Sequence, residues 1–249
     1  EPVARRLVLA CLVAVGALAL SLAGEAGVGA PAVIAGALLV IAVAIRPLLP
    51  AGTLTARRGL PSVVLMRALI AGALFGAEIY VPYLLIEDYG FSATTAGLSL
   101  TSAALLWAVG ADVQGRVGDR LGNARITVVG ATLLVVATLT ATATAAWHLP
   151  PWALISGWAL AGAGMGLMYP RLTVLTLAYS TPQNQGFNSS ALSISDSVGA
   201  SATIAVMGLT FVALSATDAA FPAVFAIATT LAVVAVLPGL RMGRAAERT

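Results

Sequence analysis

Long apolar runs follow one another along nearly the whole chain, and short polar stretches separate them. The runs fall near residues 7–24, 31–49, 62–86, 93–114, 125–147, 152–179, 187–215 and 219–240. A helix rises about 1.5 Å per residue, so about 20 apolar residues cross the hydrocarbon core of a bilayer. The pattern therefore predicts an all-α, polytopic membrane protein with about eight transmembrane helices.

The composition agrees with lipid as the main surrounding of this chain. Of its 249 residues, 59% are hydrophobic and 9% are charged, whereas a soluble domain carries about 25% charged residues. The net charge of +3 comes from arginines spread thinly between apolar runs, a spacing that does not indicate a nucleic-acid partner. Cys11, the single cysteine, lies inside an apolar run, so neither a disulfide framework nor a metal site is expected. No cofactor is predicted.

The arginines predict how the helices cross the membrane, because cytoplasmic loops are enriched in basic residues. They lie before the first run, around the ends of the second and start of the third, between the fourth and fifth, and after the eighth: Arg5, Arg6, Arg46, Arg57, Arg58, Arg67, Arg116, Arg120, Arg125, Arg241, Arg244 and Arg248. The opposite connections hold Glu25, Glu87, Asp88 and Asp218 and no arginine. We therefore expect a multi-pass protein of the cytoplasmic (plasma) membrane, with both ends of this chain in the cytoplasm.

One connection concentrates charge and glycine. It reads GRVGDRLGNAR at residues 115–125. Glycine permits close backbone approach and the positive φ of a helix end, and the aspartate can pair with an arginine. The spacing resembles the motif A loop of the major facilitator superfamily, and the matching residues are Gly115, Asp119, Arg120, Gly122 and Arg125. Asn123 and Ala124 depart from that motif, where the family often carries further basic residues. The resemblance implies a gate loop that helps to hold the inward-closed state.

The resemblance also divides the chain. Residues 62–240 would form a six-helix C-terminal transporter bundle, and residues 241–249 a basic cytoplasmic tail. Residues 1–61 would hold two further transmembrane helices and a cytoplasmic linker. This pair resembles either the pair inserted between the halves of fourteen-helix drug/proton antiporters, or the last two helices of an N-terminal half in a twelve-helix protein. In both cases the resemblance implies a missing N-terminal half, and hence a fragment of a longer protein.

Ionisable side chains inside a span cost on the order of 2.5–3.5 kcal/mol at the helix centre, so each one predicts a role. Glu78 lies well inside the third run, beside Tyr80 and Tyr83. Its carboxylate predicts a proton-coupling or cation-recognising site facing a cavity, which the two tyrosines would line. The alternatives are a structural carboxylate held by neighbouring hydroxyls, or a carboxylate that lies nearer the outer interface of the membrane.

Arg171 and Asp196 form a second candidate site. Each lies about eight or nine residues from the cytoplasmic end of its run, so their depths agree within about one helical turn and a salt bridge is possible. Such a pair would either exchange partners with a substrate or proton, or be permanent; snorkelling of Arg171 is a further alternative. Ser193 lies near Asp196 on a predicted polar stripe, which we expect to line the cavity.

These features favour a secondary active transporter that moves a small organic molecule by alternating access. The resemblance implies proton-coupled efflux, and the sequence shows no ATP-binding loop. A truncated or assembly-only membrane subunit without transport activity is the main alternative. An intramembrane enzyme is less favoured, because the sequence holds neither H-E-x-x-H nor G-x-S-x-G, and only one histidine, His148.

Overall fold

The computed structural model describes residues 3–242, in which helices are joined by short connections. The α-helices are α1 (Val3–Leu22), α2 (Ala30–Ala44), α3 (Leu60–Glu78), α4 (Tyr80–Glu87), α5 (Ala93–Leu121), α6 (Asn123–Trp147), α7 (Pro151–Ala178), α8 (Gln185–Leu214) and α9 (Ala220–Leu240). Three short 3₁₀ helices lie in the connections, η1 (Ala23–Gly29), η2 (Arg46–Leu48) and η3 (Thr53–Thr55). Residues 3–242 contain no strand, so the predicted all-α class is confirmed. The tail arginines Arg244 and Arg248 lie outside the described residues.

Seven segments of the described chain are long and apolar enough to cross a membrane. One of them, Leu60–Glu87, runs through both α3 and α4, which are separated only by a break at Ile79. Pro82 explains this break, because it has no N–H to donate to the carbonyl of Glu78 and its ring crowds that turn. The remaining predicted span is α7, which is 28 residues long but less apolar, since it contains four glycines and Arg171. The prediction of a multi-pass membrane protein is confirmed.

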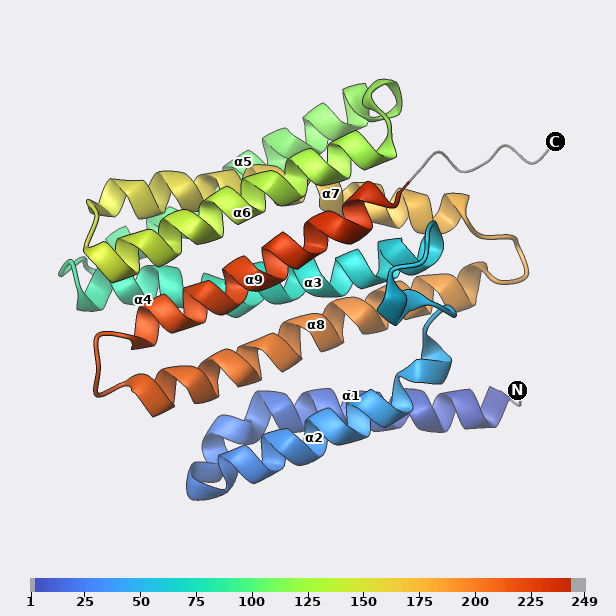
Figure 1. Ribbon diagram of the computed structural model, residues 1–249, viewed down its shortest axis with the longest axis horizontal. Helices are drawn as coiled ribbons and strands as arrows, with labels where there is room; N and C mark the ends of the chain where they lie inside the picture. Colours follow the sequence, from blue (N-terminus) through green and yellow to red (C-terminus); the bar gives the residue numbers. More distant parts are fainter. Residues whose placement is uncertain (1–2, 243–249) are drawn as a thin grey trace.

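The long helices lie side by side in a bundle (Figure 1). α7 packs along both α5 and α6, α3 packs along α8 and α9, and α6 packs along α9. One apolar core runs through α3 to α9, and its largest fully buried side chains include Trp158, Phe225 and Met66. The six spans from residue 60 onwards therefore share a single interior.

The first two helices form a hairpin beside that bundle (Figure 1). They pack on each other and on α8, through two smaller clusters of their own. Leu20, Ile34 and Ile41 meet Ala205 of α8 in one cluster, and Val13, Ala44 and Leu48 form the other. The hairpin thus adds to the bundle from one side and does not enter its core.

Glycine allows the closest helix contacts. A Cβ atom on Gly166 of α7 would collide with the carbonyl of Trp107 on α5, and one on Gly162 would collide with the backbone of Ala103. On α8, a Cβ atom on Gly199 would collide with the backbone of Ala68 on α3. These helix pairs approach so closely that only glycine fits at the crossing.

Most arginines of the described chain gather at one end of the bundle. The start of α1, the end of α2, the connection between α5 and α6, and the end of α9 all lie at that end in Figure 1. We call it the arginine end. The connections after α4, α6 and α8 lie at the opposite end, which holds Asp88 and Asp218.

Candidate functional site

A largely buried ion pair joins α3 to α8. Nε of Arg67 lies 2.9 Å from Oδ1 of Asp196, and the two side chains are 10% and 25% exposed. Tyr169 on α7 donates its hydroxyl to the same carboxylate, with 2.8 Å between its oxygen and Oδ2. Nη1 of Arg67 donates to the carbonyl oxygen of Tyr169 at 2.9 Å. Three helices therefore meet at this pair, which we call the Arg67–Asp196 node.

Aromatic stacking extends the node to a fourth helix. The guanidinium carbon of Arg67 lies 3.2 Å from the centre of the Tyr169 ring, a cation–π contact. The Tyr169 ring in turn meets Trp107 of α5 edge-on, with 5.3 Å between the ring centres. A guanidinium suits this place because it donates hydrogen bonds in its plane while its face stacks on an aromatic ring.

A second ion pair fastens α7 to the junction of α5 and α6. Nη1 of Arg171 lies 2.8 Å from Oδ1 of Asp119, and Nε of Arg171 donates to Oδ1 of Asn123 at 2.9 Å. The Arg171 side chain is 11% exposed, whereas that of Asp119 is 94% exposed. Asn123, which departs from motif A, thus takes part in holding Arg171.

The predicted pairing of Arg171 with Asp196 is wrong, because each has a different partner. Equal depth sets the height of two side chains along their helices but not the direction in which they point. Tyr169 and Arg171 are two residues apart on α7, about 200° around the helix. When Tyr169 faces Asp196, Arg171 therefore faces the junction of α5 and α6.

Arg67, expected only as an orientation signal, supplies the cation that Asp196 needs. It lies seven residues after the first residue of α3, about two helical turns. That depth was the available sequence signal, because a cation so far inside a span needs a partner. The role of Tyr169 had no comparable signal in the sequence.

The stretch 115–125 is mostly helix, and the connection between α5 and α6 consists of Gly122 alone. Gly122 has φ +83° and ψ 155°, a combination open essentially to glycine only. Gly118 is buried, and a Cβ atom there would lie 3.3 Å from Nη1 of Arg171. Gly115 has no neighbour within 4 Å of such an atom in the described chain, so of these two glycines only Gly118 lies at a close contact. Arg120 and Arg125 are exposed beside the junction, at the arginine end.

Glu78 lies half-buried at the end of α3, next to the break before α4. The two tyrosines expected beside it pack elsewhere. Tyr80 is buried against Phe211, and Tyr83 packs on both Phe211 and Phe221. Within residues 3–242 neither tyrosine hydroxyl forms a hydrogen bond with Glu78.

The predicted polar stripe on α8 divides between two surroundings. Asp196 faces Arg67 and Tyr169, whereas Ser193 lies exposed in a shallow groove that α8 forms with α1. Ser193 and Asp196 therefore have different surroundings in the described chain. Ser195 is buried and donates to the carbonyl oxygen of Val64 at 2.9 Å, which fastens α8 to α3.

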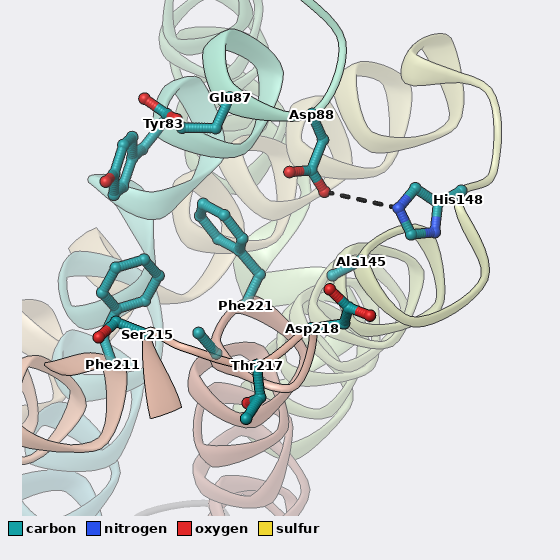
Figure 2. A pocket seen from close by; sticks show the side chains of 11 residues that line it. Tyr83, Glu87, Asp88, Ala145, His148, Phe211, Ser215, Thr217, Asp218 and Phe221 are labelled. Carbon is teal, nitrogen blue, oxygen red and sulfur yellow. Dashed lines mark ion pairs between the residues drawn. The ribbon is translucent and has the colours of Figure 1, made fainter. Parts of the chain in front are cut away.

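A cavity of about 300 Å³ opens at the end opposite the arginines (Figure 2). Its walls combine aromatic rings with carboxylates, from Tyr83, Phe211, Phe221, Glu87, Asp88 and Asp218. The carboxylate of Asp88 points to His148, with 3.9 Å between Oδ2 and Nε2. Next to it, Tyr89 donates its hydroxyl to the carbonyl oxygen of Leu149. Burial, together with the charge of Asp88, raises the pKa of Tyr89, so this hydroxyl keeps its proton.

In both ion pairs a carboxylate lies next to an arginine of another helix. Arg67 holds Asp196 and Arg171 holds Asp119, and each arginine also donates a hydrogen bond to an uncharged acceptor, the Tyr169 carbonyl or Asn123. In the described part of the chain, no group of three or more histidine, cysteine, aspartate or glutamate side chains is arranged to hold a metal ion.

The fold and these sites define a class, the polytopic helical membrane proteins whose bundle is joined by ion pairs inside the spans. Residues 63–248 match the family model of the Major Facilitator Superfamily, and the chain belongs to that superfamily, a family of transporters. A Probable actinorhodin transporter from Streptomyces coelicolor is 33% identical over 133 residues, which cover 52% of this chain and 23% of that relative. The matched part thus spans about a quarter of the relative's length.

Proposed function

We propose that this chain is the C-terminal part of a secondary active transporter, which exports a small organic molecule from the cell in exchange for protons. Membership of the Major Facilitator Superfamily supports transport as the activity, as does the relative described as a probable actinorhodin transporter. An N-terminal half would supply the other wall of the pathway, because alternating access needs two bundles that rock around a central site. The arginine end would face the cytoplasm of a plasma-membrane protein.

The Arg67–Asp196 node is the observation that carries this proposal. A charge inside a span is costly unless it is paired, so the protonation of Asp196 and the position of Arg67 depend on each other. When Asp196 takes a proton, Arg67 loses its counter-ion but keeps the carbonyl and the ring of Tyr169. Because the node joins α3, α7 and α8, a proton taken from one side of the membrane would change how these helices are held together.

The pair of Arg171 and Asp119 would act as a latch at the arginine end. Asp119 is 94% exposed, so it can leave Arg171 for water at little cost. Arg171 is 11% exposed and would still keep Asn123 as an acceptor after that separation. Because only Asp119 is exposed, the junction of α5 and α6 could separate from α7 while Arg171 still has a hydrogen-bond acceptor.

Glu78 is a second candidate for proton or cation recognition. Its carboxylate lies at the break in the span, where Pro82 leaves the Glu78 carbonyl without its usual helical donor. Such breaks at the depth of the membrane commonly lie at binding sites in transporters. A shift in the charge of Glu78 would act directly on the angle between α3 and α4.

The test uses everted membrane vesicles that contain the intact protein. Their interior is acidified, and a pH-sensitive dye reports proton release when actinorhodin or another member of a panel of organic molecules is added. The wild-type protein should dissipate the gradient with at least one compound. Asp196→Asn should abolish that response, whereas Asp112→Asn, which alters an exposed pair with Arg116, should retain it.

Two outcomes would contradict the proposal. A full response from Asp196→Asn would exclude Asp196 as the proton carrier. A wild-type protein that inserts and assembles but gives no response to any compound would instead support a membrane subunit without transport activity of its own.

A further inference from the structure

We propose that the groove between α2 and the bundle at the arginine end binds an anionic phospholipid. An acyl chain would fill the groove, and the phosphate would lie between Arg46 and Arg57. This site is separate from the transport site proposed above, and its test does not depend on transport.

The groove has a volume of about 320 Å³ and an almost wholly apolar wall. It is lined from α2, α3, α8 and α9 by Leu38, Ile41, Ile45, Leu69, Val198 and Leu231, among others. The hydroxyl of Ser195, which also lines it, is already bonded to the Val64 carbonyl. Along α2 the lining extends from Ile45 back to Leu38, about 10 Å at the helical rise per residue. These dimensions and this surface suit part of an acyl chain.

The groove continues into a second, mostly apolar hollow at the arginine end, with Arg46 in its wall. This second hollow, of about 220 Å³, is lined by Arg46 and by the connection from Leu49 to Thr55. Leu49, Thr53 and Leu54 line both spaces, so the two are adjacent. The stem of Arg57 lies against Gly52, where a Cβ atom would collide with Cδ of Arg57. Arg46 and Arg57 thus flank the place where a phosphate would follow an acyl chain out of the groove.

The charged side chains around this hollow are all positive. Residues 45–66 contain Arg46, Arg57 and Arg58 and no aspartate or glutamate. All three arginines are exposed, and within residues 3–242 they form no ion pair. Clustered basic residues next to a membrane span attract anionic lipids of the cytoplasmic leaflet. A lipid with a net negative headgroup therefore complements both the apolar groove and its mouth.

The connection that carries these arginines is fixed in place. Nη1 of Arg241 donates to the carbonyl oxygens of Thr55 and Ala56 at 2.9 and 2.8 Å. The hydroxyl of Ser62 donates to the carbonyl oxygens of Ala56 and Arg57 at 3.0 and 2.8 Å. Because these hydrogen bonds hold the connection, its arginines have fixed positions, unlike those of a diffuse basic surface. A lipid bound here would also contact both the α1–α2 hairpin and the bundle, because α2 forms one wall of the groove and α3, α8 and α9 form the other.

The test measures which lipids stay bound to the purified chain. The protein is placed in nanodiscs made of equal parts dioleoylphosphatidylcholine and dioleoylphosphatidylglycerol, extracted in mild detergent, and examined by native mass spectrometry. The wild-type chain should retain phosphatidylglycerol in preference to phosphatidylcholine. Arg46→Gln/Arg57→Gln should reduce the retained phosphatidylglycerol by about tenfold, since each arginine near the headgroup contributes to binding.

Two further variants separate a site from general attraction. Arg116→Gln/Arg120→Gln removes the same charge from α5 at the same end and should retain the lipid. Ala42→Phe fills the groove from α2 with every arginine in place, and it should lose the lipid. Thermal unfolding and size-exclusion chromatography establish that each variant is folded.

Three results would overturn the proposal. Unchanged lipid in Arg46→Gln/Arg57→Gln would remove the headgroup site. Equal losses in the two arginine double variants would reduce it to diffuse electrostatic attraction. Full retention by folded Ala42→Phe would show that the acyl chain does not occupy the groove.

Discussion

Arg67 of α3 and Asp196 of α8 are 129 residues apart in the sequence, yet Nε and Oδ1 lie 2.9 Å apart inside the bundle. The hydroxyl of Tyr169 binds the same carboxylate, and the ring of Tyr169 stacks on the guanidinium. Each charged group is therefore satisfied by partners from other helices. The energetic consequence is that α3, α7 and α8 cannot be displaced from one another without exposing a charge to lipid or giving it another partner.

Replacing Arg67 alone should lower the stability of the protein more than replacing both Arg67 and Asp196. Arg67→Gln leaves Asp196 with Tyr169 but without its counter-ion. A fully buried pair loses about 3–5 kcal/mol in such a change, and we expect less here because Asp196 is 25% exposed. Adding Asp196→Asn removes the orphaned charge and should recover part of the stability. Thermal unfolding of the purified chain in detergent measures this, and strictly additive losses would contradict the coupling.

The glycines of the junction between α5 and α6 should differ in their tolerance of alanine. Gly122→Ala places a Cβ atom on a backbone with φ +83° and ψ 155°, so we expect a loss of about 1–3 kcal/mol. Gly115→Ala meets no neighbour within 4 Å and improves helix propensity, so it should leave stability unchanged or raise it by about 0.5–1 kcal/mol. Unfolding midpoints distinguish the two. Equal destabilisation would contradict the different surroundings described for these glycines.

The contact between α5 and α7 should depend on Gly166. A Cβ atom there collides with the carbonyl of Trp107, so Gly166→Ala must push the helices apart, at a cost of about 1–3 kcal/mol. Gly97→Ala, on α5, has no neighbour within 4 Å and is the control. Near-ultraviolet circular dichroism should change in the first variant, because the edge-on contact of Trp107 with Tyr169 is disturbed. An unchanged spectrum together with wild-type stability would contradict this crossing geometry.

Neutralising Glu78 should uncouple transport without preventing folding. In the intact protein, Glu78→Gln preserves the shape of the side chain but removes its charge at the break between α3 and α4. We expect normal membrane insertion and loss of substrate-induced proton release in everted vesicles. Glu87→Gln, in the cavity at the opposite end from the arginines, is the control and should retain the response. Wild-type coupling in Glu78→Gln would rule out an essential proton role for this carboxylate.

Helix positions could be predicted well from the sequence, and helix ends less so. The run predicted at 93–114 continues as α5 to Leu121, through a stretch that was expected to form a turn. Gly115 and Gly118 do not stop a helix that neighbouring helices support, and only the positive φ of Gly122 ends it. The break at Ile79 lies in a run that its hydrophobicity alone presents as continuous.

The sequence by itself determined the class of this protein, the approximate places of its helices, and the end at which its arginines gather. These properties depend on local length and composition, because any segment of about 20 apolar residues must bury itself in lipid or protein wherever it lies in the fold. Motif residues 115–125 likewise indicated the superfamily from their own spacing.

The tertiary structure alone decided which charges are paired. Arg171 binds Asp119 and Asn123, and Asp196 binds Arg67, although Arg171 and Asp196 lie at similar depths. A pairing depends on the rotation of each helix about its axis and on which helices are neighbours. Both follow from close packing at glycines such as Gly166 and Gly199, between segments far apart in the chain. Depth along a helix can be counted from the sequence, but the direction in which a side chain points is set by packing.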